Sequence, residues 1–250
     1  MLDTSPARAP TPSTAHPSWA PGPPHPELGE GAVHVWRADL AAVSDEVLDL
    51  LSPEEHARAE RFLRERERRL WSRAHGVLRT LLGRYLAQDP RTLRFTPGAH
   101  GKPALLDDRP ESPATPKRAA VTPAPLSFNL SHSGGLALYA FSAIGPVGVD
   151  VEVADRPIDE LAIAARAFDS EEVRRLAELE PAVREQEFLR AWVRHEAALK
   201  CRGIGIGGAA NGVVGAEPWI VELEAGSRAA AAVAVERPPH ELRCWAVAGR

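Results

Sequence analysis

The alternation of hydrophobic and polar positions predicts short β-strands in two separate parts of the chain. The segments "AVHVW" (32–36) and "VGVDVEV" (147–153) are rich in β-branched residues and have the two-residue period of a strand. Each is followed by a pair of strand-like segments, "LSFNL" with "LALYAFSA" after the first and "AAVAVE" with "LRCWAVA" after the second. We therefore expect two sets of strands, one in each half of the chain.

Predicted helices lie between these strands and also occur in matching pairs. The segments "SPEEHARAERF" (52–62) and "DSEEVRRLAEL" (169–179) each begin with a capping residue and early acids, which suit the start of a helix. The segments "WSRAHGVLR" (71–79) and "WVRHEAALK" (192–200) share Trp, Arg, Leu and a final cation at identical spacing. Convergence of two amphipathic helices by chance is one explanation, and duplication of a whole unit is the other.

Duplication agrees better with the matching order of strands and helices. It predicts an α+β fold in which two similar α/β halves, 31–147 and 148–250, are related by a pseudo-twofold axis. Outside these halves, residues 1–30 hold eight of the 23 prolines, which predicts a disordered leader. A second proline-rich segment, 103–125, is expected to be a surface loop.

Composition narrows the class of protein. The 250 residues are 44% hydrophobic and 26% charged, as in ordinary globular proteins. A net charge of −4 argues against binding nucleic acid through overall charge. The sequence has no apolar run long enough to span a bilayer, and its two cysteines form no CxxC pair. We expect a cytoplasmic protein without a nucleic-acid or membrane partner.

Two acids in the strand "VGVDVEV" suggest a metal site. The strand period places the valines on one face, and Asp150 and Glu152 together on the other. Neighbouring carboxylates repel each other unless a positive charge lies between them, and oxygen ligands favour Mg²⁺. The alternative is an edge strand whose acids point into water.

The helix at 188–200 offers a third acid and a cation. Glu196 and Lys200 are one turn apart and share a face. A surface ion pair would explain them equally well, but the first half has Gly76 at the position of Glu196, so the acid belongs to the second half alone.

The stretch "NLSHSGG" (129–135) places His132 between two serines before a glycine pair. Hydroxyls, an imidazole and the backbone N–H groups of a turn suit an anion such as phosphate, whereas a plain polar hairpin turn is the alternative. A serine-hydrolase elbow is excluded because a strand-like segment follows where that motif needs a helix.

Four motifs in order resemble the signature of the 4′-phosphopantetheinyl transferase family, in its Sfp-type, pseudo-dimeric members. They are "GKP" (101–103), "FNLSHS" (128–133), "GVDVE" (148–152) and "WVRHEAALK" (192–200), and the resemblance covers nearly all of residues 31–248. It implies transfer of 4′-phosphopantetheine from coenzyme A to a serine of an acyl, peptidyl or aryl carrier protein, with release of adenosine 3′,5′-bisphosphate. It also implies Mg²⁺ as a cofactor and a monomeric enzyme.

The resemblance assigns roles to the acids and to the helix lysine. It implies that Asp150, Glu152 and Glu196 bind Mg²⁺ beside the pyrophosphate of coenzyme A. It further implies that Lys200 neutralises charge on this pyrophosphate, and Glu196 is the plausible base for the incoming serine. Asp150, Glu196 and Lys200 are thus the expected catalytic residues.

The expected contacts to coenzyme A come from both halves. By resemblance, His132 contacts the 3′-phosphate side and Lys102 lies near the nucleotide, and the hydroxyl of Ser131 is a further candidate. Arg58 and Arg79 are candidates for the 3′-phosphate, although either can equally be solvated helix surface.

Two positions depart from the family pattern. His195 stands where the family usually has a lysine before the helix glutamate, and Glu55 stands where a lysine often follows "SPE". These changes affect the expected binding of coenzyme A, with Arg58 or Arg61 as substitutes for the missing lysine, and leave the proposed metal ligands intact.

Two other functions are compatible with the same residues. One is a non-catalytic coenzyme A-binding or carrier-docking module. The other is a Mg²⁺-dependent enzyme acting on a different pyrophosphate compound. The presence together of Asp150, Glu152, Glu196 and Lys200 favours an active transferase over a decayed one.

Overall fold

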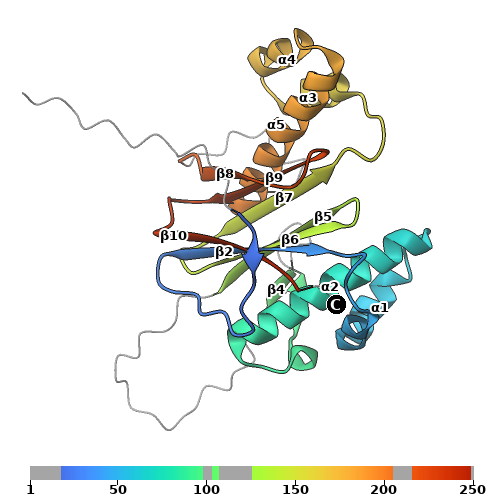
Figure 1. Cartoon of the computed structure of the whole chain (residues 1–250), viewed down its shortest axis with the longest axis vertical. Helices are drawn as coiled ribbons and strands as arrows, with labels where there is room; N and C mark the ends of the chain where they lie inside the picture. Colours follow the sequence, from blue (N-terminus) through green and yellow to red (C-terminus); the bar gives the residue numbers. More distant parts are fainter. Residues whose placement is uncertain (1–17, 98–102, 107–125, 205–215, 249–250) are drawn as a thin grey trace, which may run out of the picture.

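The computed structural model describes residues 18–97, 103–106, 126–204 and 216–248, and these form four stacked layers. In Figure 1, helix α5 (Pro181–Arg202) covers a three-stranded sheet, and helix α2 (Glu65–Leu86) covers a five-stranded sheet on the opposite side. The two sheets lie between the helices. This arrangement is the mixed α+β class that the sequence predicts.

The larger sheet has the strand order β1-β10-β2-β6-β5. Its strands are β1 (Ala20–Pro21), β2 (Ala32–Asp39), β5 (Ser127–Ser133), β6 (Leu136–Ser142) and β10 (Glu241–Ala246). Strands β2 and β5 both pair antiparallel with β6, whereas β10 runs parallel to β2. A two-residue turn at Gly134 and Gly135, with φ of 59° and 98°, joins β5 to β6. The "SHSGG" stretch is therefore the tip of a hairpin.

The smaller sheet has the order β7-β9-β8, with antiparallel pairing throughout. Its strands are β7 (Val147–Val153), β8 (Trp219–Leu223) and β9 (Ala229–Val235). On β9, alanines lie opposite both acids of β7. Small neighbours leave space beside the two carboxylates. Strands β3 (Phe95–Pro97) and β4 (Pro103–Leu105) form a separate two-stranded sheet.

The remaining helices are short and begin at capping residues. They are α1 (Pro53–Ala59), α3 (Glu160–Ala167), α4 (Ser170–Ala177) and the 3₁₀ helices η1 (Asp45–Leu50) and η2 (Pro90–Thr92). Helix α1 has a full capping box between Ser52 and Glu55, and α4 is capped by Asp169. Both helices lie where the sequence predicts them. Among the described residues, no helix is long and apolar enough to cross a membrane.

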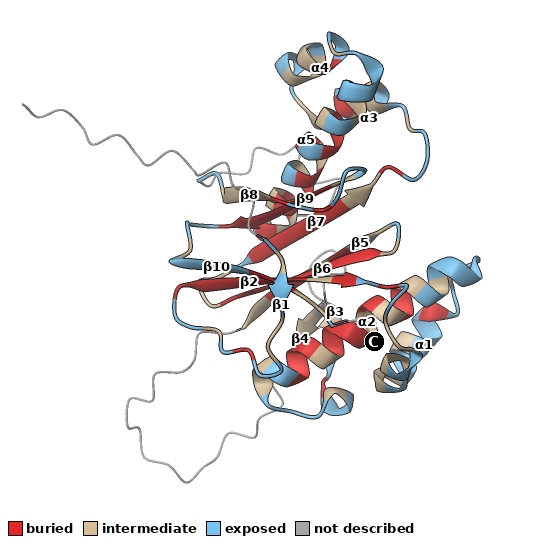
Figure 2. Cartoon of the chain, viewed as in Figure 1, coloured by how far each residue is buried: buried red, intermediate tan, exposed pale blue. Residues whose placement is uncertain are grey.

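Three hydrophobic cores hold the layers together. The first lies between the two sheets and includes three valines of β7, Val147, Val149 and Val151. The second fills the space between α2 and the larger sheet, and the third fills the space between α5 and the smaller sheet. Figure 2 shows the consequence, since strands β6, β7 and β9 are buried over most of their length. The strand that carries the acids is thus covered on both of its faces.

The two predicted halves share an order of elements. In the first, strand β2 leads through helix α2 to the hairpin β5–β6; in the second, β7 leads through α5 to β8–β9. The sheet orders β2-β6-β5 and β7-β9-β8 correspond strand by strand. The last strand, β10, leaves the second half and pairs with β2, so it does not form a pair with β9 as its sequence suggests. The pseudo-twofold axis stays a prediction.

The predicted leader is partly structured. Residues 1–17 lie outside the described residues, but β1 pairs with β10, and the Trp19 indole N–H donates to the Glu224 carbonyl at 2.6 Å. The expectation of disorder is wrong for this later part, because one aromatic side chain and an open sheet edge give it something to bind. Of the predicted loop at 103–125, residues 103–106 are described, and Pro103–Leu105 is strand β4.

Candidate active site between strand β7 and helix α5

The acidic face of β7 points at helix α5, as the strand period predicts. The close approach depends on Gly148, because a Cβ at this position would lie 2.0 Å from the Ala197 carbonyl oxygen and 2.4 Å from the Cys201 nitrogen. Asp150 is 3% exposed, and Glu152, two residues further on, is partly buried. The glycine of the "GVDVE" motif therefore brings the two acids within reach of the helix.

Helix α5 places Glu196 and Lys200 against these acids. The Lys200 ammonium donates to Asp150 Oδ1 at 2.5 Å, to Ser131 Oγ at 3.1 Å and to the Val149 carbonyl at 3.3 Å. Glu196 is buried at 6% exposure, one helical turn earlier. The surface ion pair considered as the alternative is wrong, since Lys200 pairs with Asp150 across the two elements.

The site has a surplus of negative charge. Burial raises the pKa of Glu196 and of Glu152, and the charge of Asp150 raises both further. Asp150 Oδ2 and Glu196 Oε1 are buried and accept no hydrogen bond, and they are the two such side-chain atoms in the part of the chain that is described. Buried carboxylate oxygens without partners are costly, and a bound cation would satisfy them.

The described residues nevertheless contain no group of three or more His, Cys, Asp or Glu side chains already arranged as a metal site. One oxygen of Asp150 is held by Lys200, which also partly neutralises the cluster. The two buried oxygens without a hydrogen-bond partner still favour a bound cation, because an uncompensated buried charge is costly. The donor set, oxygen only, fits Mg²⁺.

Strand β5 separates the residues of "NLSHS" between two sides. Ser131 Oγ donates to Asp150 Oδ1 at 2.8 Å, and Ser133 Oγ donates to Glu152 Oε2 at 2.8 Å. His132 lies between them in sequence, and its side chain alternates to the opposite side of the strand. The hydroxyl of Ser131 is thus engaged with an acid, a role that sequence analysis did not assign to it.

The side of β5 that carries His132 faces helix α2. His132 is exposed at the end of β5, but partial desolvation of its ring, with smaller effects from the charges of His75 and Lys200, lowers the pKa of His132 to about 4, so the imidazole is neutral at pH 7. His75 stacks on Trp71 with ring centroids 3.9 Å apart, and its Nδ1 lies 3.6 Å from Glu55 Oε1. Sequence analysis missed His75; the imidazole in the first of the two matching helices was the available signal.

Arg79, a candidate for the 3′-phosphate, is built into the protein interior. Its side chain is 1% exposed and donates to Glu55 Oε2 at 2.6 Å and to the carbonyls of Pro90 and Leu93 at 2.8 and 3.0 Å. The guanidinium also stacks over Phe95. These contacts make Arg79 a structural residue rather than an available phosphate ligand, which corrects the sequence-based expectation.

Two further residues, Arg58 and Lys102, were expected to contact coenzyme A. Arg58 is exposed on α1, with its guanidinium 5.5 Å from the centre of the Trp71 ring that His75 stacks on. It therefore remains accessible next to the His75 side of the site. Lys102 lies outside the described residues.

His195 stands where the family usually has a lysine, so a positive charge is missing at this position. Burial lowers the pKa of this imidazole, and the charge of Arg202 lowers it further. The ring packs edge-on to Phe168 at 5.6 Å. His195 is therefore neutral at pH 7 and adds no positive charge beside Glu196.

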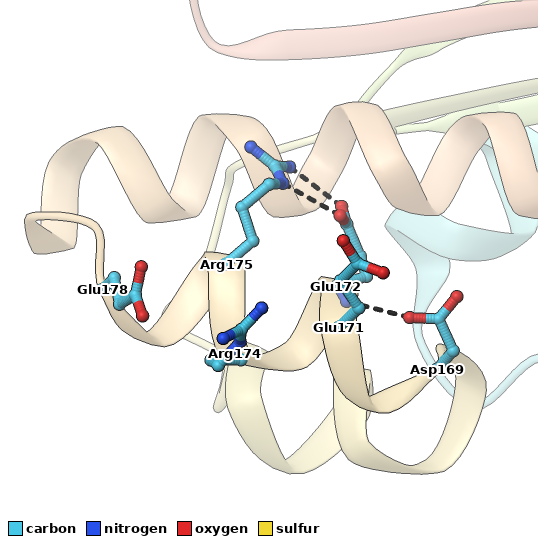
Figure 3. A pocket seen from close by; sticks show the side chains of 6 residues that line it. All are labelled: Asp169, Glu171, Glu172, Arg174, Arg175 and Glu178. Atoms are coloured by element: carbon cyan, nitrogen blue, oxygen red, sulfur yellow. Dashed lines mark hydrogen bonds and ion pairs between the residues drawn. The ribbon is translucent and has the colours of Figure 1, made fainter.

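A surface hollow of about 310 Å³ lies on α4, away from these acids (Figure 3). It is lined by Asp169, Glu171, Glu172, Arg174, Arg175 and Glu178. Arg175 pairs with Glu172, and Asp169 caps the helix, so much of the lining charge is already satisfied. We do not regard this hollow as the substrate site, because the orphaned buried oxygens lie elsewhere.

Comparison with known proteins agrees with this geometry. The family model described as "4′-phosphopantetheinyl transferase superfamily" matches residues 146–242, the segment that contains β7 and α5. The chain is 37% identical to the 4′-phosphopantetheinyl transferase HetI of Nostoc sp. over 193 residues, 76% of each chain. It is 37% identical to a putative 4′-phosphopantetheinyl transferase of Synechocystis sp., covering 66% of this chain and 62% of the relative. Identity to the 4′-phosphopantetheinyl transferase Sfp of Bacillus subtilis is 26%, over 65% of each chain.

The fold and site define an α+β protein with a buried acidic cluster where the second half meets strand β5 of the first. With a relative 37% identical over three quarters of both chains, the protein belongs to the 4′-phosphopantetheinyl transferase superfamily.

Proposed function

We propose that this protein transfers the 4′-phosphopantetheine group from coenzyme A to a serine of an apo carrier protein, in a Mg²⁺-dependent reaction. The observation that carries the proposal is the convergence of Asp150, Glu152, Glu196 and Lys200 from β7 and α5, with two buried carboxylate oxygens that have no protein partner. Membership of the transferase superfamily supports the reaction class.

The residues present fit a magnesium ion. Asp150, Glu152 and Glu196 would hold it, because Asp150 and Glu196 each have an orphaned oxygen and all three repel one another electrostatically. When bound, Mg²⁺ would neutralise charge on the pyrophosphate and stabilise the leaving phosphate. The neighbouring alanines of β9 leave this region without bulky side chains.

The chain's own residues supply the proton transfer and the positioning. Glu196 accepts the proton of the carrier serine, and its raised pKa makes it a stronger base than an exposed carboxylate. The serine oxygen bonds to the phosphorus of the phosphopantetheine phosphate as the bond from this phosphorus to the oxygen of adenosine 3′,5′-bisphosphate breaks. Lys200 lies beside the acids and offsets the charge that develops on the leaving phosphate.

Coenzyme A would extend from the acids across the end of β5 toward α2. His132 lies on that side of the strand, with His75 and the exposed Arg58 nearby. A single chain supplies every residue of the proposed site, so the proposal requires no second copy of the protein. Both cysteines are free and buried, which fits a reducing, cytoplasmic environment.

The first experiment incubates the protein with coenzyme A, Mg²⁺ and a panel of apo acyl and peptidyl carrier proteins. Mass spectrometry should show a gain of one phosphopantetheine on at least one carrier. Binding of coenzyme A without any gain would instead support a non-catalytic module. Turnover of a different pyrophosphate compound would support another Mg²⁺-dependent enzyme.

The matched variants are Asp150→Asn and, as a control, Glu222→Gln. Asp150→Asn keeps the size of the side chain but removes the charge that the cation and Lys200 need, so we expect the transfer rate to fall by about 10² or more. Glu222 of β8 pairs with the exposed Arg194 of α5, is not one of the proposed ligands, and should tolerate substitution. A transfer rate for Asp150→Asn equal to that of the control, at saturating Mg²⁺, would refute the assignment. Circular dichroism confirms that both variants fold.

A further inference from the structure

Strands β5 and β7 belong to different sheets, yet hydrogen bonds between them form a regular seam. The Val149 N–H donates to Asn129 Oδ1 at 2.8 Å, and the Val153 N–H donates to Ser133 Oγ at 3.2 Å. Backbone groups of β7 that would be unpaired at the sheet edge are thus satisfied by side chains of β5. Alternate residues of the "NLSHS" motif make this seam.

Ser133 is bound on both sides of its hydroxyl. Its oxygen accepts from the Val153 N–H, and its proton is donated to Glu152 Oε2 at 2.8 Å. Because an ionised carboxylate can only accept hydrogen bonds, the hydroxyl proton of Ser133 is the one that lies between the two side chains. Among the described residues, Ser133 is the hydrogen-bond partner of the Glu152 side chain. Asp150, by contrast, is held by both Ser131 and Lys200.

The hairpin tip fixes the position of Ser133. Gly134 follows it with a φ of 59°, and a Cβ on this glycine would lie 2.7 Å from the Val153 Cβ. The glycine therefore lets the end of β5 approach β7 closely, at the level of Glu152. This contact is independent of the hydrogen bonds and places Ser133 at the same point.

We propose that Ser133 is a positioning residue that orients Glu152 for the divalent ion. The serine donates to Oε2 of Glu152 and fixes the orientation of this carboxylate, which would help to hold the ion. The proposal rests on the proposed function, since it assigns Glu152 to the metal. Hydrogen bonds to ligating carboxylates fix their orientation, and losing such a bond typically weakens metal binding about 10-fold to 100-fold.

The test measures metal binding directly, with Mn²⁺ as a paramagnetic probe followed by electron paramagnetic resonance. Ser133→Ala removes the donor to Glu152, and Ser133→Thr keeps a hydroxyl. Ser127→Ala is the matched control, because Ser127 lies on the same strand and at the same alternation, at the end away from the acids. Thermal unfolding of each variant checks that the seam still forms.

We expect Ser133→Ala to bind Mn²⁺ about 10-fold more weakly than the wild type, with Ser133→Thr restoring most of the affinity and Ser127→Ala unchanged. In the transfer assay, the Mg²⁺ concentration for half-maximal rate should rise by a similar factor. The rate at saturating Mg²⁺ should change much less, which separates an effect on the metal from a loss of folded protein.

The outcomes distinguish the two proposals. Equal Mn²⁺ affinity in the wild type and Ser133→Ala overturns the role of Ser133, and transfer by the wild type would leave the proposed function standing. A serine-dependent Mn²⁺ affinity in a protein that modifies no carrier supports the role of Ser133 while refuting the transferase. Loss of affinity in Ser127→Ala as well would show that the strand, not the hydroxyl, matters, and would overturn the inference.

Discussion

Lys200 is engaged with Asp150 before any substrate arrives. Its three ammonium protons meet three acceptors, Asp150 Oδ1, Ser131 Oγ and the Val149 carbonyl. A cation among three acids offsets part of the negative charge that they share. Under the proposed function, an incoming pyrophosphate would share this ammonium with Asp150, and Lys200 would link the acid cluster to the substrate.

An ion pair also occurs at the matching position of the first half, where it stabilises the structure. Arg79 corresponds to Lys200 in the repeated helix pattern, and it pairs with Glu55 as Lys200 pairs with Asp150. Burial alone would raise the pKa of Glu55, but its contacts to His75, Ser52 and Arg79 outweigh burial and lower the pKa. Glu55, which stands where the family often has a lysine, thus forms an ion pair with the buried Arg79. The positive charge that a lysine would offer to a phosphate is missing at this position.

A buried histidine in the first sheet predicts a loss of stability in acid. His34 is 1% exposed, and burial lowers its pKa to about 4. Its Nδ1 lies 2.9 Å from the Tyr85 hydroxyl, which accepts a hydrogen bond from the Trp36 indole and so can donate to the imidazole. The unfolded chain, with an ordinary pKa near 6.5, then binds more protons between pH 6.5 and 4.

Stability should therefore be complete above pH 6.5 and fall as the pH drops toward 4. From pH 7 to pH 5, we expect His34 to reduce the free energy of unfolding by roughly 2 kcal/mol. Urea denaturation of the wild type and of His34→Gln at both pH values measures this. The variant should lose that part of the pH dependence and keep the remainder. An identical pH dependence in the two proteins would contradict the prediction.

At the scale of elements, the sequence predicts the strands and helices in which hydrophobic and polar residues alternate with a regular period. The two-residue period of "VGVDVEV" correctly separates buried valines from acids, and the helical period correctly joins Glu196 to Lys200 on one face. The local pattern does not reveal β8, whose first four residues are only partly buried, or the pairing of β10 with β2. Such pairings depend on contacts between residues far apart in the chain, which a local pattern does not encode.

In the site, too, the features set by a local pattern were predictable, and the contacts between distant segments were not. Asp150, Glu196 and Lys200 were predictable because strand and helix periods fix their directions. The roles of Ser131 and Ser133 were not, because nothing in β5 indicates that its neighbour across the seam is β7. Likewise, Gly76 seemed to be a position lacking an acid, whereas a Cβ there would lie 2.4 Å from the Val47 carbonyl oxygen, so the glycine serves packing against η1.

The approach of β7 to α5 gives a prediction for the elements as a pair. A Cβ at Gly148 would meet the Ala197 carbonyl oxygen at 2.0 Å, and backbone atoms cannot yield as a flexible side chain can. Gly148→Ala should push the strand away from the helix, cost about 1–3 kcal/mol of stability and weaken Mn²⁺ binding. Denaturation and Mn²⁺ titration of the same preparation measure both effects.

Gly29→Ala is the control, because nothing lies within 4 Å of a Cβ at that position. It should leave stability and Mn²⁺ affinity close to wild type. A Gly148→Ala protein as stable as this control would show that the two elements can adjust, and that the glycine is not what sets their separation.

At the scale of the whole molecule, the site requires both halves. The acids and Lys200 come from β7 and α5, whereas Ser131, Ser133 and His132 come from β5 of the other sheet. The valine core between the sheets holds these strands together. A separated second half, which contains the residues matched by the family model, would lack the serines that contact its acids.

The segment before β2 contributes to this assembly at the opposite edge of the larger sheet. Strand β1 covers the outer edge of β10, the Gly22 N–H donates to the Ala246 carbonyl at 3.0 Å, and Trp19 packs near Arg37. Each such hydrogen bond contributes about 0.5–1.5 kcal/mol, and removing them also exposes the edge of β10 to other chains. Because β10 connects the end of the second half to β2, weakening it loosens the joint between the halves.

Two truncations isolate this contribution. Deleting residues 1–22 removes β1 and Trp19, whereas deleting residues 1–17 keeps every contact described for the segment. We expect the longer deletion to have the lower melting temperature, by about 2–4 °C for each kcal/mol lost, and to form more oligomer in size-exclusion chromatography. Carrier modification at low temperature should be equal in both, because no residue of the acidic site is removed. Equal melting temperatures would mean that β1 only rests on the sheet, and that β10 is held to β2 without it.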